Sequence, residues 1–84
     1  MKKHEWKEVM EDGTTRILRA SHKAGQWWVM AKLKGGDWET LDPVPLVDLR
    51  SLREVLWNKY QRNRLALKSV EEIDQMIARA EGLG

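Results

Sequence analysis

A tryptophan and several arginines between residues 50 and 64 would lie on one side of a helix. At about 100° per residue, four side chains fall within a wedge of about 60°: Arg50, Arg53, Trp57 and Arg64. Arg62 adds a cation to the same segment. Guanidinium groups contact phosphates and an indole ring stacks on bases, so these five residues are a candidate nucleic-acid-binding set. This interpretation requires a helix that stays regular to residue 64.

The spacing also predicts a contact within this set. Arg53 and Trp57 are four residues apart, which places them on neighbouring turns of a helix for a cation–π contact. The alternative is that Trp57 borders the core and the arginines form a solvated rim. A third interpretation is that the arginines bind an acidic protein.

The charges of the second half of the chain form two blocks. Residues 50–68 carry six basic side chains and one acidic one, whereas residues 69–84 carry four acidic side chains and one basic one. A basic block can indicate an anionic partner. It can equally indicate two helices whose opposite charges pair with each other.

Residues suited to catalysis or metal binding are sparse. The chain has no cysteine, so it has no thiol nucleophile and no thiolate ligand. The two histidines, His4 and His22, lack further ligands at a suitable spacing, and we expect both at the surface. Glu71, Glu72 and Asp74 suit the first turn of a helix, where the helix dipole favours negative charge. The sequence therefore predicts a non-enzymatic protein with no cofactor and no metal site.

An apolar sheet face is the second candidate site. Its residues, the protein-interface set, are Trp6, Trp28, Met30 and Leu41. A contiguous exposed apolar patch usually marks an interaction site. The chain's own second helix, a second copy of the chain or another partner could cover this one. The alternative function is therefore a protein-interaction or self-associating, homodimeric domain with no nucleic-acid role.

This face depends on the register of the strands expected within residues 4–41. Turn signals divide this part into an antiparallel meander of three to four strands. The first turn, at residues 11–13, suits a three-residue loop with glycine in the left-handed position. It sets Trp6 opposite Leu18 and Glu8 opposite Arg16, so that apolar and oppositely charged neighbours meet.

The other two turns place the third strand. A loop at residues 23–25 would set Leu18 opposite Met30, and a turn at Gly35-Gly36 would set Met30 opposite Leu41. Because neighbouring strand residues point to opposite faces, the adjacent Trp27 and Trp28 must be divided between the two faces. We expect one face to form the core: Val9, Ile17, Trp27, Val29, Ala31, Leu33 and Trp38. Trp28 then belongs to the mixed face, with the protein-interface set.

Two amphipathic helices follow the sheet. Pro43 and Pro45 end the strands, and a helical apolar period begins near residue 46. We expect helices over about 46–63 and 70–81. Ser69 and Glu72 form an S-x-x-E capping box, which predicts Ser69 as the N-cap of the second helix. The fold class is therefore α+β.

Composition limits the class of protein. Eighty-four residues, 42% hydrophobic and 33% charged, correspond to a single small α+β domain spanning residues 1–84. No apolar run approaches the roughly 20 residues of a membrane span, and no signal peptide is evident, so we expect a cytoplasmic protein with no membrane partner. The favoured function is a small binding module that contacts nucleic acid through the arginine and tryptophan stripe.

Overall fold

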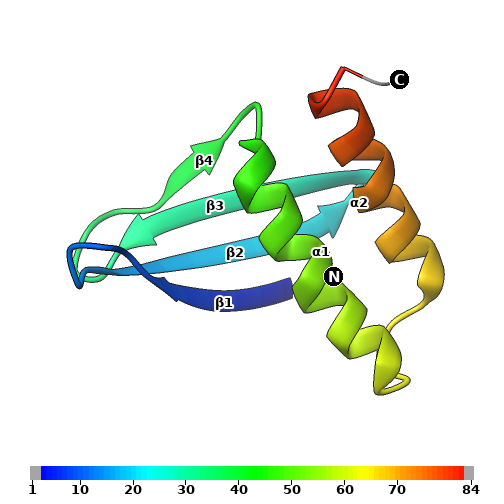
Figure 1. Ribbon diagram of the computed structural model, residues 1–84, viewed down its shortest axis with the longest axis horizontal. Helices are drawn as coiled ribbons and strands as arrows, with labels where there is room; N and C mark the ends of the chain where they lie inside the picture. Colours follow the sequence, from blue (N-terminus) through cyan, green and yellow to red (C-terminus); the bar gives the residue numbers. More distant parts are fainter. Residues whose placement is uncertain (1–2, 83–84) are drawn as a thin grey trace. The chain divides into compact units, whose positions relative to one another are not determined.

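The first half of the chain forms a four-stranded antiparallel sheet with the strands in sequence order (Figure 1). The strands are β1 (Lys3–Val9), β2 (Thr15–Lys23), β3 (Gln26–Leu33) and β4 (Glu39–Leu41). The second half forms the helices α1 (Leu46–Gln61) and α2 (Leu67–Ala80). This computed structural model describes residues 3–82. The predicted α+β class is confirmed.

The chain divides into two compact units, which we call the sheet unit and the helical unit. The sheet unit spans residues 1–43 and the helical unit residues 44–84. The division falls at the proline-containing segment, where the sequence predicts the end of the sheet.

The hairpin of β1 and β2 has the predicted register. Trp6 lies opposite Leu18 and Glu8 opposite Arg16. Gly13 has φ of 86°, the left-handed conformation that the three-residue loop requires. Hydrogen bonds from the Thr14 hydroxyl and backbone N–H hold the pKa of Asp12 below its usual value. Local turn chemistry therefore sets this hairpin.

The register between β2 and β3 differs from the predicted one by one residue. Leu18 pairs with Ala31, not with Met30, and Lys23 pairs with Gln26. The connection is a two-residue turn in which Ala24 and Gly25 have φ of 53° and 75°. Positive φ at both central residues is the pattern of a type I′ turn, whose twist matches that of the strands. Alanine rarely adopts positive φ, so the sequence favours a longer loop that the chain does not use.

The register between β3 and β4 was also predicted wrongly by one residue. Leu41 pairs with Val29, not with Met30. The chain turns one residue earlier than expected, at Lys34 and Gly35, and the Gly36 N–H donates to the Leu33 carbonyl over 2.8 Å. Asp37 and Trp38 then lie outside the strands.

These two differences turn β3 over relative to the rest of the sheet, because a one-residue slip moves every side chain to the other face. Four buried side chains share one face, here called the Leu18 face: Leu18, Ala20, Val29 and Ala31. The predicted core face is wrong for β1, where Val9 is 76% exposed, and for the end of β3, where Leu33 is 51% exposed. It is also wrong for β2, where Ile17 lies on the face opposite Leu18. The predicted division of the two tryptophans is correct, since Trp27 shares a face with Val29 and Trp28 lies on the opposite one.

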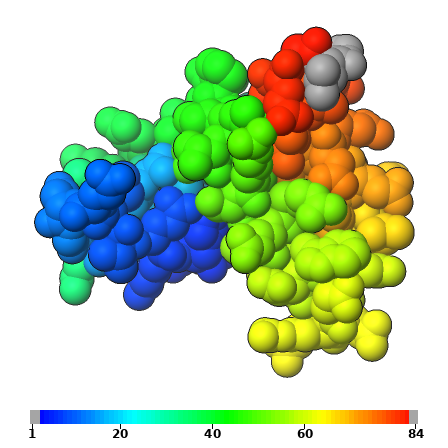
Figure 2. All heavy atoms as spheres, viewed as in Figure 1, coloured from blue at the N-terminus to red at the C-terminus, as the bar shows by residue number. Residues whose placement is uncertain are grey.

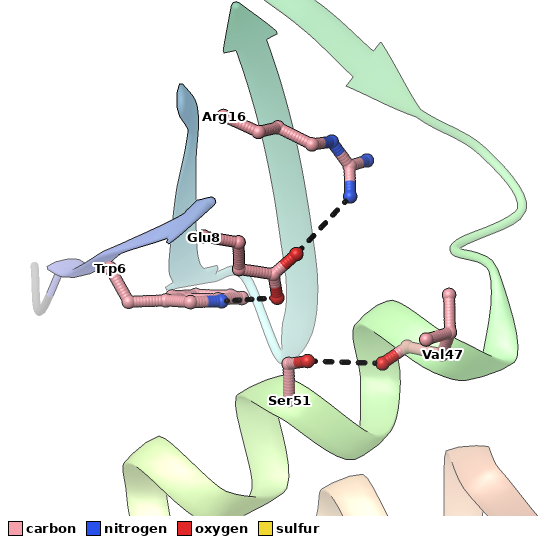
Figure 3. Close-up of polar contacts among 5 residues, drawn as sticks. All are labelled: Trp6, Glu8, Arg16, Val47 and Ser51. Atoms are coloured by element: carbon pink, nitrogen blue, oxygen red, sulfur yellow. Dashed lines mark hydrogen bonds and ion pairs between the residues drawn. The ribbon is translucent and has the colours of Figure 1, made fainter. Parts of the chain in front are cut away.

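The helical unit contains an apolar stripe on each helix. Its buried apolar side chains are Leu49, Leu52, Leu56, Leu65, Val70 and Ile73. α1 begins directly after Pro45, which serves as its N-cap. Asp48, in the first turn, is buried, where the helix dipole favours a carboxylate. One turn further on, the Ser51 hydroxyl donates to the Val47 carbonyl over 3.2 Å (Figure 3).

The predicted capping box does not cap α2. The helix begins at Leu67, its N-cap is Ala66, and Ser69 lies inside the first turn. α1 ends at Gln61, and the connection turns through Asn63, whose φ is 57°. This short connection and the buried Leu65 allow α2 to start three residues earlier than the capping pattern indicates.

Replacing Ala24 with asparagine will stabilise the second hairpin. Asparagine tolerates positive φ better than alanine, and Asn-Gly is a preferred type I′ pair. We expect the free energy of unfolding to rise by about 0.5–1 kcal/mol, measured by urea denaturation. Ala24→Val, which is β-branched, should lower it. If Ala24→Asn destabilised the chain, the two-residue turn would be wrong.

The start of α2 can be tested separately. Ala66→Ser supplies the missing N-cap oxygen, so it should raise the free energy of unfolding by about 0.5–1 kcal/mol. Ser69→Ala removes no cap in this structure and should change stability by less than about 0.5 kcal/mol. A loss of about 1 kcal/mol or more in Ser69→Ala would instead support the capping box.

Candidate nucleic-acid interface

Two of the five predicted nucleic-acid-binding residues are paired with acidic residues of the same unit. The Arg50 guanidinium lies 2.6 Å from a Glu81 carboxylate oxygen. The Arg53 Nε donates to Asp74 of α2. The two helices therefore pair their opposite charges at these positions, which was one of the two explanations of the charge blocks.

Trp57 makes the predicted contact with Arg53. The guanidinium carbon lies 5.5 Å from the centroid of the Trp57 ring. The ring also packs against Tyr60, with centroids 5.4 Å apart, and remains 37% exposed. The i, i+4 spacing alone was sufficient to predict the cation–π contact.

Arg62 and Arg64 do not continue the stripe. Arg62 is the C-cap of α1 and Arg64 follows the left-handed Asn63, so the assumption of a regular helix to residue 64 is wrong. Residues 61–64 are exposed, and this segment is the yellow one at the surface in Figure 2. Burial, and secondarily the nearby charge of Arg64, lower the pKa of Lys59. The five residues thus form two groups. Arg50, Arg53 and Trp57 lie on α1, where both arginines are ion-paired. Arg62 and Arg64 lie at the end of the helix.

The predicted protein-interface set is divided between the two faces of the sheet. Trp6 and Leu41 lie on the Leu18 face, whereas Trp28 and Met30 lie on the other. The Trp6 indole N–H donates to Glu8 over 3.3 Å, and Glu8 also lies 3.8 Å from Arg16 (Figure 3). The structure does not bring the four residues together, because β3 is turned over.

The face opposite the Leu18 face, here called the Trp28 face, is strongly basic. Alternation along the paired strands places five cationic side chains on it: Lys3, Lys7, Arg19, Lys23 and Lys32. Glu5 is the acidic strand residue on the same face. It is held by Arg19, whose Nη2 lies 2.9 Å from the Glu5 carboxylate. The Trp28 face therefore carries an excess of four positive charges.

The Leu18 face has a different charge pattern. Its strand residues include one cation, Arg16, and two carboxylates, Glu8 and Glu39. The sheet therefore separates most of its cations onto one side. Sums over blocks of sequence hide this separation, since opposite faces alternate within each block. A count of charges at every second position reveals the separation within β1 and β2, whereas the face of Lys32 depends on the register of β3.

Trp38 lies over the Trp28 face, not in the predicted core. The Arg19 guanidinium carbon is 4.6 Å from its ring centroid, and the Lys32 ammonium is 5.0 Å from it. Both cations are attracted by the quadrupole of the indole. Trp38 thus holds an arginine of β2 and a lysine of β3 at one place on the face.

Trp28 is the most exposed tryptophan on the sheet, with 44% of its surface accessible. Its cross-strand partner on β2 is Ser21, a small polar residue. The next residue on the same face of β3 is Met30, which is half-buried. An exposed aromatic ring among cations is the feature that nucleic-acid-binding surfaces use for stacking.

The histidines form a ring cluster on the Leu18 face. The Trp27 ring packs against both, with centroids 5.8 Å from His4 and 5.1 Å from His22. His4 is buried, with only 4% exposed, so its predicted surface position is wrong. Within residues 3–82, no group of three or more potential ligands could hold a metal ion.

No protein family model matches the chain, and no curated protein or solved structure matches it either. Within the part of the chain that the structure describes, neither helix is long and apolar enough to cross a membrane.

The pairing of α1 with α2 can be measured by a double-mutant cycle on Arg53 and Asp74. Both side chains are partly exposed, so we expect a coupling of about 0.2–1 kcal/mol from Arg53→Ala, Asp74→Ala and the double variant. The coupling should fall when salt is added, because exposed ion pairs are screened. A coupling of zero at low salt would show that Arg53 is available to other anions.

Proposed function

We propose that the protein binds nucleic acid through the Trp28 face of its sheet. The observation that carries the proposal is an exposed tryptophan, Trp28, on a sheet face with five cations. The acidic strand residue of this face, Glu5, is already paired with Arg19. Cations supply phosphate contacts, and an exposed indole supplies a stacking surface for bases.

The distribution of the cations supports contact with a long anion. They come from three neighbouring strands and include both ends of the face, with Lys23 beside the β2–β3 turn and Lys7 toward the other end of β1. A polyanion can contact several such positions at once and release several counterions. A small anion would instead need groups that converge on one point.

An ordinary solvated sheet face is the competing explanation of the same residues. A solvated face usually mixes both signs of charge. Here the acidic strand residues Glu8 and Glu39 lie on the opposite face, together with one cation. The separation of charge, combined with the exposed Trp28, favours a binding surface.

Self-association through the Trp28 face is disfavoured by the same charges. Two copies of the face would bring lysines and arginines together, which costs several kcal/mol when like charges are juxtaposed. Of the predicted protein-interface set, Trp28 and Met30 lie on this face. Cationic side chains interrupt the apolar surface that these two residues form.

Charge reversal at two exposed lysines tests the proposal. Lys7→Glu with Lys23→Glu removes two phosphate contacts and adds two repulsions, so affinity for a DNA or RNA fragment should fall at least about tenfold at low salt. Fluorescence anisotropy with a labelled fragment measures this. The wild-type affinity should also fall steeply with salt, in proportion to the phosphates neutralised.

Arg62→Glu with Arg64→Glu is the matched comparison, because it changes the net charge equally at the exposed end of α1. We expect a much smaller loss from this pair. A larger loss from Arg62 and Arg64 than from Lys7 and Lys23 would move the binding surface to the helical unit. Absence of binding to DNA and RNA at low salt would overturn the function itself.

A further inference from the structure

We infer that the Trp28 face binds single-stranded nucleic acid. A base stacks on the Trp28 indole, and the two cations beside Trp38, Arg19 and Lys32, contact the phosphate backbone of the strand. This inference rests on the proposed function and specifies its ligand. The two tryptophans on this face, Trp28 and Trp38, have different surroundings.

The Trp28 ring is open to a stacking partner. On one side its cross-strand neighbour is Ser21, whose side chain is too small to cover an indole. On the other side, the pairing of β3 with β4 ends at Val29 and Leu41, so no β4 residue pairs with Trp28. With 44% of its surface accessible, the ring is available to a flat ligand.

The Trp38 ring has a different role, because cations already occupy its surroundings. Arg19 and Lys32 both lie within 5.0 Å of its centroid. Each cation–π contact restricts a long side chain that would otherwise sample many rotamers. Trp38 is therefore a positioning residue for Lys32 and for Arg19, whose guanidinium also pairs with Glu5. Trp28 is the residue that contacts a base.

An exposed indole favours a single strand over a duplex. In a duplex the faces of the bases are stacked on one another, and proteins read the hydrogen-bonding edges of the bases in the grooves. In a single strand each base has a free π-face, and stacking on aromatic side chains tolerates any sequence. The main feature that Trp28 presents is a ring, whose single hydrogen-bonding group is the indole N–H. The chemistry of this residue therefore suits an unpaired base.

The test compares one sequence in three forms: a DNA strand of about 12 nucleotides, its duplex, and the corresponding RNA strand. We expect the wild-type protein to bind at least one single strand more tightly than the duplex. Trp28→Ala should weaken single-strand binding about tenfold or more, which is the effect of losing one stacked base. It should weaken duplex binding less than about threefold.

Two further variants make the result specific. Trp28→Phe keeps an aromatic ring and should retain most of the single-strand affinity. Trp57→Ala removes a similarly exposed indole from α1 and should have little effect. Binding of the strand should quench indole fluorescence in the wild type, and this quenching should be smaller in Trp28→Phe. The quenching comparison tests the stacking even if Trp28→Ala does not fold.

The outcomes separate the two proposals. Duplex binding as tight as single-strand binding, or an equal loss for both forms in Trp28→Ala, would overturn the single-strand inference and leave nucleic-acid binding standing. No binding to any of the three forms would overturn the proposed function.

Discussion

The two-residue turn between β2 and β3 is the constraint on which the arrangement of the sheet depends. Ala24 and Gly25 both adopt positive φ, so Lys23 pairs directly with Gln26 and the rest of β3 follows in register. A loop one residue longer would pair Leu18 with Met30 and move Trp28 to the Leu18 face, opposite Ala20. Because strand side chains alternate with a period of two, the conformation of this turn decides which residues share a face.

With this register the sheet separates its functions by face. Leu18, Ala20, Val29 and Ala31 gather on one side and are buried. The other side receives the alternate residues of the strands, which include four lysines, Arg19 and the exposed Trp28. One strand sequence therefore contributes to both core and surface. The candidate interface is consequently a property of three strands together, since no single segment contains it.

In the helical unit, the opposite charges lie next to each other and form ion pairs. Its arginines Arg50 and Arg53 meet Glu81 and Asp74, so the basic and acidic blocks neutralise each other where the two helices run side by side. The same residue types that suggest phosphate contact in the linear sequence thus form ion pairs between the two helices. On the Trp28 face of the sheet unit, by contrast, the cations outnumber the carboxylate that accompanies them.

The sequence by itself determined the features that depend on near neighbours. The α+β class, the first hairpin with its Glu8–Arg16 and Trp6–Leu18 pairs, and the Arg53–Trp57 contact follow from periodicity, a glycine turn and a four-residue spacing. Tertiary structure decided the register of β3, the start of α2, the pairing of Arg53 with Asp74 and the position of Trp38. These depend on an alanine at positive φ or on residues distant in sequence. Only the sum of many contacts in the folded chain can offset such local costs.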